Sequence, residues 1–313
     1  MGDAAGVGPE IIAKLFQRPE PVAGFVIGDA IQMRRAVQLI GGSLVVDEVD
    51  SPCFAKPGRV PVLPISHLPD NLTYGAVDAR AGKAAHDAVT LAGRMAMDGK
   101  IRAIVTAPLN KEAMQLAGIR QPGHTEILAG IAGTDDFGMM LANDELRVML
   151  VSIHVSLRDA LALVTQERVL RTIRLANRGT AAFGLAKPRV AVAGLNPHAG
   201  EAGLMGVEDM EIIAPAIADA KAEGIDASGP YPPDTIFMRA RRGEFDCVVA
   251  QYHDQGLIPV KYLGLDNGVN ITIGLPFVRT SVEHGTAFDI AGQGKADPSS
   301  LAYALKIAEA MTR

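Results

Sequence analysis

Three of the seven histidines occupy the same kind of position in this sequence. His154 follows the run LRVMLVSI, His198 follows RVAVAGLNP and His253 follows DCVVAQY, so each comes shortly after a predicted buried strand. Because the carboxyl ends of parallel strands face one crevice, where ligands bind, the three rings could converge there. Three neutral imidazoles that leave a fourth position open form a catalytic metal site, for which zinc is the leading ion and Mg or Co are other candidates. The alternative is that each ring only hydrogen-bonds to its own loop.

Two acidic residues accompany these histidines. Asp254 directly follows His253, and Glu201 follows His198 in the stretch NPHAGE. Either carboxylate could accept a hydrogen bond from a ring N–H and so orient the imidazole. As ordinary solvated loop residues they would have no such role, and the sequence leaves both interpretations open.

A second group of residues is suited to an anion. The stretch PGHTE at 122–126 precedes an apolar helical segment, so free backbone N–H groups and the helix dipole favour a phosphate there. Lys261, Asn270 and Arg279 follow the third histidine, and each is expected in a loop or at a strand end. A lysine supplies a point charge and an arginine a bidentate fork for such an anion. The alternative is ordinary surface charge.

The segment HGTAFDIAGQG at 284–294 is rich in glycine, which lets backbone approach a ligand closely. No G-x-G-x-x-G motif occurs, because the nearest candidate, Gly6-Val7-Gly8, has Ile11 in place of the third glycine. The sequence therefore does not support an ordinary Rossmann dinucleotide site.

Short β-branched runs alternate with helical patterns along most of the chain, which indicates an α/β protein with mainly parallel sheets. The clearest strands are expected at 103–106, 146–153, 189–193 and 246–251. Helices are expected at 208–222 and after Thr165, which can cap a segment in which Val169, Ile173 and Ala176 recur at helical spacing. A length of 313 residues favours two domains. We expect a discontinuous domain, 1–120 plus 260–313, and a second domain at 121–259.

Composition excludes several classes of protein. Hydrophobic residues make up 48% and charged residues 21%, which excludes a largely disordered chain. A net charge of −5 and the absence of tryptophan argue against a nucleic-acid partner. Two cysteines suit a reducing cytoplasm, and neither a long apolar run nor a basic leader is present. We therefore expect a cytoplasmic enzyme with no membrane partner.

Together these motifs resemble the 4-hydroxythreonine-4-phosphate dehydrogenase family, PdxA, in order and over essentially the whole chain. The matching stretches are TAPLNKEA (106–113), PGHTE (122–126), GLNPHAGE (194–201), PPDT (232–235), YHDQG (252–256) and GLPFVRTSVEHGTAFDIAG (274–292). The stretch HGTAFDIAGQGKADP also resembles the adenosine-binding loop of isocitrate and isopropylmalate dehydrogenases, which bind NAD without the Rossmann fingerprint.

The resemblance implies a two-domain α/β/α sandwich like that of isocitrate and isopropylmalate dehydrogenases. It implies that the discontinuous domain is the cofactor-side domain and that 121–259 is the metal-binding and dimerisation domain. It further implies a homodimer whose active site lies in the interdomain cleft at the dimer interface. His154, His198 and His253 match the divalent-metal ligands of the family, with His253 contributed by the partner subunit. NAD or NADP is expected at five positions of the glycine-rich loop: Gly285, Thr286, Ala287, Asp289 and Gly292.

The resemblance also implies a substrate and a reaction. The expected substrate-binding residues are His124, Thr125, Lys261, Asn270 and Arg279, and the expected catalytic residues are Lys261 and Asp234. In the implied reaction, hydride leaves a secondary alcohol carbon of a 4-phosphorylated hydroxy acid for the nicotinamide, and the resulting β-keto acid loses CO2. The metal would act as a Lewis acid.

The chain departs from the common family pattern at its start and near the second histidine. The strand that opens the fold in other members is absent from this sequence, and Ala4 replaces the proline of GDPAG. Leu204 lies where the vitamin B6 enzymes more often carry a histidine, which favours the branch that oxidises D-threonate or D-erythronate 4-phosphate. A terephthalate dihydrodiol dehydrogenase and a sugar-phosphate sensor without catalysis are the alternatives.

Overall fold

The computed structural model describes residues 1–264 and 268–312, and the chain divides into two compact units. Unit 1 comprises Met1–Asp135 and Leu275–Glu309, and unit 2 comprises Asp136–Gly274 with a few residues at the C-terminal end. The sequence-based boundaries differ at two stretches, 121–135 and 260–274. Ile127 and Leu128 in the first stretch pack in one apolar cluster with unit 1. Residues of the second stretch pair with a strand of unit 2.

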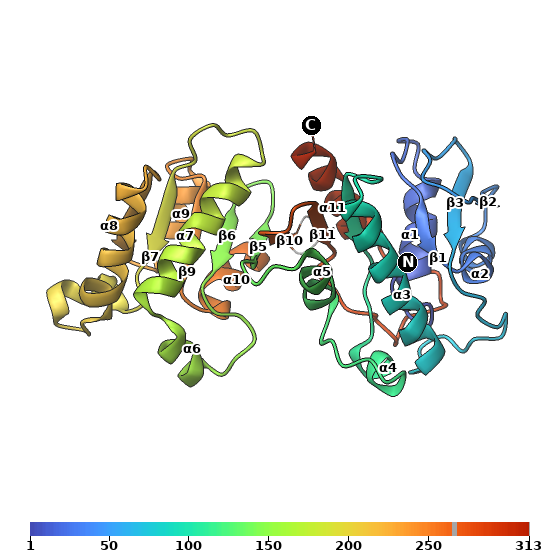
Figure 1. Cartoon of the computed structure of the whole chain (residues 1–313), viewed down its shortest axis with the longest axis horizontal. Coiled ribbons are helices and arrows are strands. Elements are labelled where there is room, and N and C mark those ends of the chain that lie inside the picture. The colour runs from blue at the N-terminus through green and yellow to red at the C-terminus, as the bar shows by residue number, and fades with distance from the viewer. Residues whose placement is uncertain (265–267, 313) are drawn as a thin grey trace. The chain divides into compact units, whose positions relative to one another are not determined.

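Unit 1 contains a three-stranded parallel sheet in the order β1-β3-β2 and a parallel strand pair, β4–β11 (Figure 1). Its strands are β1 (Val26–Gly28), β2 (Val45–Glu48), β3 (Arg59–Pro64), β4 (Ala103–Thr106) and β11 (Val278–Ser281). Its helices are α1 (Gly8–Gln17), α2 (Ala30–Ile40), α3 (Ala79–Met97), α4 (Lys111–Leu116), α5 (His124–Ala132) and α11 (Ser299–Met311).

Local sequence determines where these helices begin. The side chains of Asp29, Asp78 and Asn110 accept hydrogen bonds from backbone N–H groups in the first turns of α2, α3 and α4. Such caps satisfy N–H groups that have no partner within the helix. Helix α1 has no such side-chain cap and instead carries Pro9 in its first turn, where the missing N–H costs nothing.

Unit 2 contains strands in the order β10-β5-β6-β9-β7-β8 (Figure 1). The strands are β5 (Gly138–Ala142), β6 (Arg147–Leu150), β7 (Val190–Ala193), β8 (Ala227–Tyr231), β9 (Cys247–Ala250) and β10 (Val269–Ile273). The pairs β6–β9, β9–β7 and β7–β8 are parallel, whereas β5 is antiparallel to both of its neighbours. The other elements are α6 (Leu157–Leu163), α7 (Gln166–Ala181), η1 (Pro197–Gly203), η2 (Asp209–Ile213), α8 (Ala214–Ala222), α9 (Ile236–Arg241) and α10 (His253–Tyr262).

Helices cover both faces of this sheet, which explains why β7 and β9 are buried at every position. Alternate side chains of the strands, such as Val148 and Val248, pack with Ile236 of α9 and Leu257 of α10. Side chains of other strand positions, such as Met140, lie against α7 on the opposite face, next to Gly179. The loops that carry the three histidines therefore begin at a sheet whose two faces are both packed against helices.

The fold predicted from the sequence is confirmed as a mixed α/β fold with mostly parallel strands. The four predicted strands correspond to β4, β6, β7 and β9, and the helix predicted to begin after Thr165 is α7, which Thr165 caps. One expected placement is wrong. Lys261 lies in helix α10 and not in a loop, because apolar Leu257 and Val260 extend that helix along the sheet.

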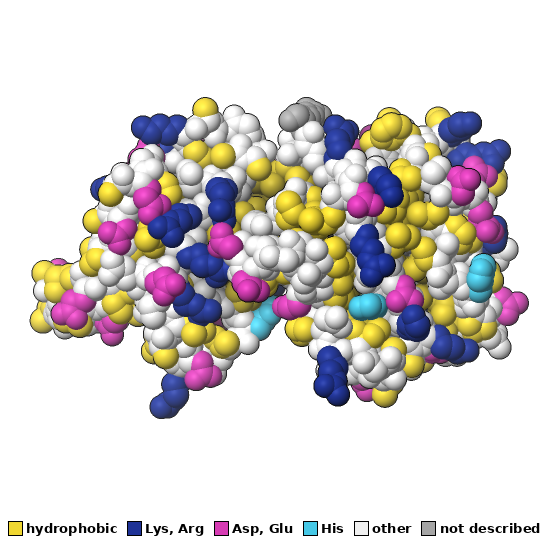
Figure 2. Space-filling model, viewed as in Figure 1, with side chains coloured by type: hydrophobic (Ala, Val, Ile, Leu, Met, Phe, Trp, Pro, Cys, Tyr) yellow, Lys and Arg dark blue, Asp and Glu magenta, His cyan; other side chains and the backbone are white. Residues whose placement is uncertain are grey.

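Charged side chains of both signs are interspersed on the face of the molecule drawn in Figure 2. This mixture agrees with the small net charge of −5. Within the part of the chain that the structure describes, no helix has the length and apolar character needed to cross a membrane.

Candidate active site

The three histidines follow three strands that are neighbours in the sheet of unit 2. Strand β9 lies between β6 and β7, and all three run parallel, so their carboxyl ends share one edge. His154 follows β6, His198 follows β7 and His253 follows β9. This common edge is the arrangement that the sequence pattern predicts.

His154 and His253 lie side by side within one chain. Their ring centroids are 5.6 Å apart and the ring planes are tilted by 46°. The two rings line a hollow together with Ile153, Val155, Leu157, Ala160, Tyr252 and Asp254. Two imidazoles in a partly apolar hollow are a suitable donor pair for a borderline-soft divalent ion such as zinc.

Asp254 orients the ring of His253. The Oδ1 atom of Asp254 lies 2.6 Å from Nδ1 of His253, a distance that suits a hydrogen bond donated by the Nδ1–H. In that tautomer the Nε2 lone pair is available to a metal, and a carboxylate partner raises the basicity of the ring. This contact matches the orienting role considered for Asp254 from the sequence.

His198 lies in a strained turn. Five consecutive residues of η1, from His198 to Ala202, have φ between 45° and 81°, and Gly200 is the one glycine among them. Each non-glycine residue in this left-handed region carries a cost, so the surrounding structure must hold the turn in place. Strain of this kind is found mainly at binding and catalytic sites.

Buried Asp209 holds the backbone that leads into this turn. Its Oδ1 accepts the N–H of Leu195 at 2.8 Å, and its Oδ2 accepts the side-chain amide of Asn196 at 2.9 Å and the backbone N–H at 3.2 Å. A Cβ on Gly194 would come within 2.7 Å of Oδ1, so glycine is needed for this approach. Sequence reasoning missed Asp209, because no motif connects it to His198.

A buried hydrogen-bond network joins the roots of the three loops. Ser152 Oγ donates to the carbonyl of Gln251 at 3.0 Å, which links the end of β6 to the end of β9. Gln251 Nε2 donates to the carbonyl of Ala193 at 2.7 Å, and Gln255 Nε2 to that of Gly194 at 2.8 Å. These amide bonds link the end of β9 to the end of β7. These buried bonds restrain the three loops relative to one another, although Gln251 Oε1 itself has no hydrogen-bond partner among the described residues.

No group of three His, Cys, Asp or Glu side chains in residues 1–264 and 268–312 is arranged to hold one metal ion. One chain therefore brings together two of the three expected ligands. His253 lies beside His154 within one chain, and the expectation that the partner subunit supplies His253 stays a prediction. The ligand that remains outside this pair is His198.

Three of the expected substrate residues belong to unit 1. His124 and Thr125 begin helix α5, and Arg279 lies in β11, where its Nη2 donates to Thr106 Oγ1 at 2.8 Å. Burial lowers the pKa of Arg279 to about 10, so the guanidinium stays charged at neutral pH. Burial, with a contribution from the Arg279 charge, lowers the pKa of His124 well below its usual range.

His124 has a buried Nε2 atom without a hydrogen-bond partner, which marks a place for a ligand atom. The α5 N-terminus adds free N–H groups, and buried Arg279 adds positive charge. This chemistry suits an oxyanion such as a phosphate.

The remaining expected residues lie in unit 2. Lys261 is exposed in the last turn of α10, and Asn270 is half-buried in β10 opposite Leu141. Asp234 is exposed in the turn between β8 and α9. Because eight residues of one helix separate them, Lys261 lies roughly 12 Å along α10 from His253.

The glycine-rich loop at 285–294 belongs to unit 1. Gly285 has open space where a side chain would project, and the carboxylate-bearing Asp289 is exposed. Ala287 adopts a left-handed conformation with φ of 44°. An exposed backbone with a free carboxylate suits the hydroxyl groups of a ribose, so the loop fits the nucleotide part of a nicotinamide cofactor.

A family model described as "Pyridoxal phosphate biosynthetic protein PdxA" matches residues 20–308. A 4-hydroxythreonine-4-phosphate dehydrogenase of Beijerinckia indica is 54% identical over 98% of this chain and 92% of its own length. A D-threonate 4-phosphate dehydrogenase of Pectobacterium atrosepticum is 46% identical over 98% of this chain and 96% of its own length. The crystal structure of 4-hydroxythreonine-4-phosphate dehydrogenase from Klebsiella pneumoniae superimposes with a TM-score of 0.93 at 44% identity, over 100% of this chain and 97% of that one. From these matches it follows that the chain belongs to the PdxA family.

Proposed function

We propose that this dehydrogenase oxidises the secondary alcohol of a small 4-phosphorylated hydroxy acid, with NAD or NADP as the oxidant. Candidate substrates are 4-hydroxythreonine 4-phosphate and D-threonate or D-erythronate 4-phosphate, since relatives with both kinds of name cover nearly the whole chain. The observation that carries the proposal is the His154–His253 pair, whose second ring is oriented by Asp254.

The reaction consists of two balanced steps. The C–H of the alcohol carbon leaves with its electron pair as hydride to the nicotinamide, and the hydroxyl proton passes to a base, for which Lys261 and Asp234 are our candidates. In the second step the C–C bond to the carboxylate of the β-keto acid breaks, CO2 leaves and its electron pair forms an enolate that is then protonated. A divalent ion held by the histidines would supply Lewis-acid stabilisation of the developing oxygen charge.

The phosphate is assigned to residues other than the three metal-site histidines. His124, Thr125 and Arg279 of unit 1 supply the N-terminus of α5 and a buried positive charge, and Lys261 and Asn270 remain candidate substrate-binding residues. Binding of a remote, unreactive group in this way positions the reacting carbon and lowers the barrier.

The metal site needs a second copy of the chain. In a homodimer the ion would be bound by histidines of both subunits. The family resemblance implies that the partner subunit supplies His253, whereas the His154–His253 pair within one chain favours His198 as the ligand from the partner subunit. Support comes from exposed apolar side chains on the elements of unit 2 that flank the histidines. They are Val155, Leu157, Leu161, Leu204, Met205, Val207, Met210, Ile258 and Tyr262. Exposed apolar surface of this kind is typical of subunit interfaces.

The test is a substrate panel assayed for NADH and NADPH production, with metal content measured on the same preparation. The panel contains 4-hydroxythreonine 4-phosphate, D-threonate 4-phosphate, D-erythronate 4-phosphate, their unphosphorylated forms and a dicarboxylate cis-dihydrodiol. We expect a phosphorylated acid to be oxidised with the largest kcat/KM. Equal activity on an unphosphorylated acid would overturn the phosphate assignment, and no activity with any acid would leave the sensor interpretation as the better one.

A further inference from the structure

Helix α1 holds the glycine-rich loop through two charged side chains that no sequence motif marks. Lys14 Nζ donates to the backbone carbonyl of Gly294 at 2.9 Å and to that of Ala296 at 2.6 Å. Glu10 Oε1 accepts the N–H of Ala296 at 2.7 Å and lies 3.2 Å from Lys14 Nζ. The Glu10 side chain is 3% exposed and that of Lys14 21%, so solvent screens these contacts less than it screens a surface ion pair.

The other end of the loop is attached to the same segment. The N–H of Val7 donates to the carbonyl of Thr286 at 3.0 Å. A Cβ on Gly6 would come within 2.8 Å of that oxygen, so the two backbones are in close contact. Residues 6–14 therefore hold the loop at its beginning and at its end, and its middle remains exposed.

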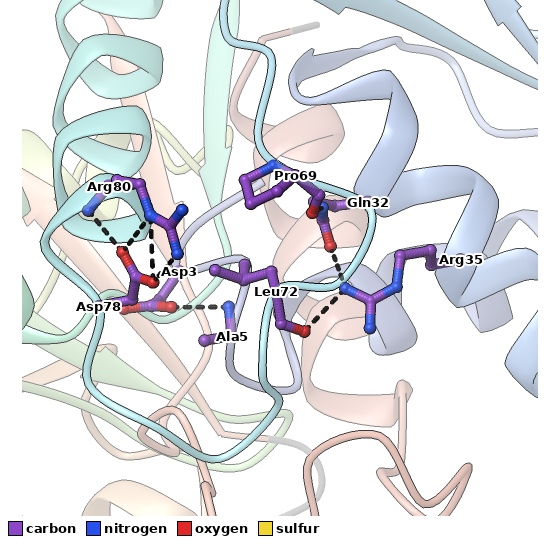
Figure 3. Close-up of polar contacts among 8 residues, drawn as sticks. All are labelled: Asp3, Ala5, Gln32, Arg35, Pro69, Leu72, Asp78 and Arg80. Atoms are coloured by element: carbon purple, nitrogen blue, oxygen red, sulfur yellow. Dashed lines mark hydrogen bonds and ion pairs between the residues drawn. The ribbon is translucent and has the colours of Figure 1, made fainter.

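A second segment supports the loop from the side. Gly292 lies against the Tyr74 ring, which a Cβ at that position would approach to 2.4 Å. Arg35 stacks over the same ring at 4.4 Å. It also donates to the carbonyl of Leu72 at 2.9 Å, and Gln32 donates to that of Pro69 at 2.7 Å (Figure 3). Helix α2 thus holds the segment around Tyr74 in place, and α1 holds the glycine-rich loop directly.

We propose that Lys14 and Glu10 are positioning residues for the nicotinamide cofactor. The inference rests on the proposed function, in which the 285–294 loop binds that cofactor. A loop that is already held in its binding conformation loses little conformational entropy when the ligand arrives, and a loose loop loses more and binds more weakly. Lys14 holds two carbonyl groups at the end of this loop, so its removal should release that end.

The chain offers a matched control on helix α3. Lys83 forms an ion pair with Asp87 four residues later, as Lys14 does with Glu10 four residues earlier. The Lys83–Asp87 pair is exposed, and both residues belong to α3. Replacement of Lys83 removes a similar helical ion pair without a change at the glycine-rich loop.

The experiment compares Lys14→Met with Lys83→Met in the full chain. Fluorescence titrations with NADH and, separately, NADPH give Kd, and hydrogen–deuterium exchange of the ligand-free protein follows the amides of residues 286–297. For Lys14→Met we expect a roughly tenfold higher Kd for the nucleotide that the wild type binds, together with faster exchange in this loop. Zinc affinity, kcat at saturating nucleotide and all properties of Lys83→Met should stay at the wild-type level.

Two further variants keep the test decisive if Lys14→Met folds poorly. Lys14→Arg retains the donors and should recover most of the nucleotide affinity. Glu10→Gln retains the acceptor for Ala296 but loses the attraction to Lys14, and should raise Kd a few-fold.

The possible contrary results have different meanings. Unchanged exchange in Lys14→Met would show that Lys14 does not hold the loop. Faster exchange with unchanged nucleotide affinity would overturn the positioning role and leave the cofactor site in place. If the wild type binds neither NADH nor NADPH, the cofactor assignment of the proposed function fails, and the positioning role fails with it.

Discussion

Burial sets the charge state of several single residues in unit 1. Arg279 is charged at neutral pH although burial lowers its pKa to about 10, while His124 beside it is neutral. A neutral ring next to a guanidinium can accept or donate a hydrogen bond without repelling that guanidinium, and the arginine supplies the charge that an oxyanion needs. The same principle applies to Cys247, whose pKa burial raises to about 12, so that it behaves as a small apolar residue.

Asp3 gives a prediction about pH. Burial, and to a smaller degree the charge of Asp78, raise the pKa of Asp3 to about 6, although its Oδ1 accepts the N–H of Ala5 (Figure 3). A raised carboxyl pKa means that the folded state binds the proton more tightly, so stability is highest below the unfolded pKa of about 4 and is lost as pH rises through 6.

Asp3→Asn should therefore be more stable than the wild type at pH 8, by about 3 kcal/mol, and the difference should disappear near pH 4. Urea unfolding of both proteins between pH 4 and pH 8 measures this. A constant difference across that range would show that folding does not shift the pKa of Asp3.

Lys261 gives a second prediction at this scale. Lys261→Ala should lower kcat/KM for the phosphorylated substrate by about 10- to 100-fold, because a charge-assisted hydrogen bond contributes roughly 1.5–3 kcal/mol. Since Lys261 is exposed, Tm should not change. Lys221→Ala, at an exposed lysine in the last turn of α8, is the matched control. A similar kinetic loss in both variants would point to a general effect of surface charge.

At the scale of elements, the three histidines are positioned by three short strands and the turns that follow them. Strands β6, β9 and β7 have four residues each, yet helices on both faces fix them, and the amides of Gln251 and Gln255 join their ends. The loops can therefore be irregular, as η1 is, without losing their position. The stability of the sheet offsets the strain of the left-handed turn.

The Asp209 carboxylate is the element-scale test of this arrangement. Asp209→Ala removes the acceptor of three hydrogen bonds to Leu195 and Asn196, and should destabilise the protein by about 2–4 kcal/mol while weakening zinc binding. Urea unfolding and zinc titration measure the two effects. Glu208→Ala removes a single hydrogen bond to Asn196 from a partly exposed position and should cost less than about 1 kcal/mol. Equal losses in the two variants would argue against a special role for Asp209.

At the scale of the whole molecule, the proposed dimer would supply the third histidine ligand of the metal site. In the proposed homodimer, the His154–His253 pair of one subunit would be joined by His198 of the partner subunit, whereas the family resemblance implies that His253 is the partner's ligand. Mixed dimers test this assignment, because complementary variants restore one intact site only if the mutated ligands come from different chains.

After subunit exchange, His154→Ala with His198→Ala should recover up to about a quarter of wild-type activity, since half of the dimers are hybrid and each has one intact site. His154→Ala with His253→Ala should recover none, since both ligands belong to the same chain. Activity measured after confirmed exchange decides between the two pairings. Recovery in the second mixture and none in the first would place His253, not His198, on the partner subunit.

The sequence by itself determined the α/β class, the strands that carry the histidines and the family. These depend on local pattern: β-branched runs, helix caps such as Thr165 and short motifs are visible over a few residues. The common edge of β6, β9 and β7 also followed, because parallel strands place their carboxyl ends together.

Only the tertiary structure decided which side chains meet. The pairing of His154 with His253 depends on β6 and β9 being neighbours, and the amide network and Asp209 depend on contacts between segments distant in sequence. The attachment of the glycine-rich loop to Lys14 joins residues that are 280 positions apart. Periodicity and motif spacing report a residue's local environment and not its distant partners, so no pattern in the sequence could have indicated these contacts.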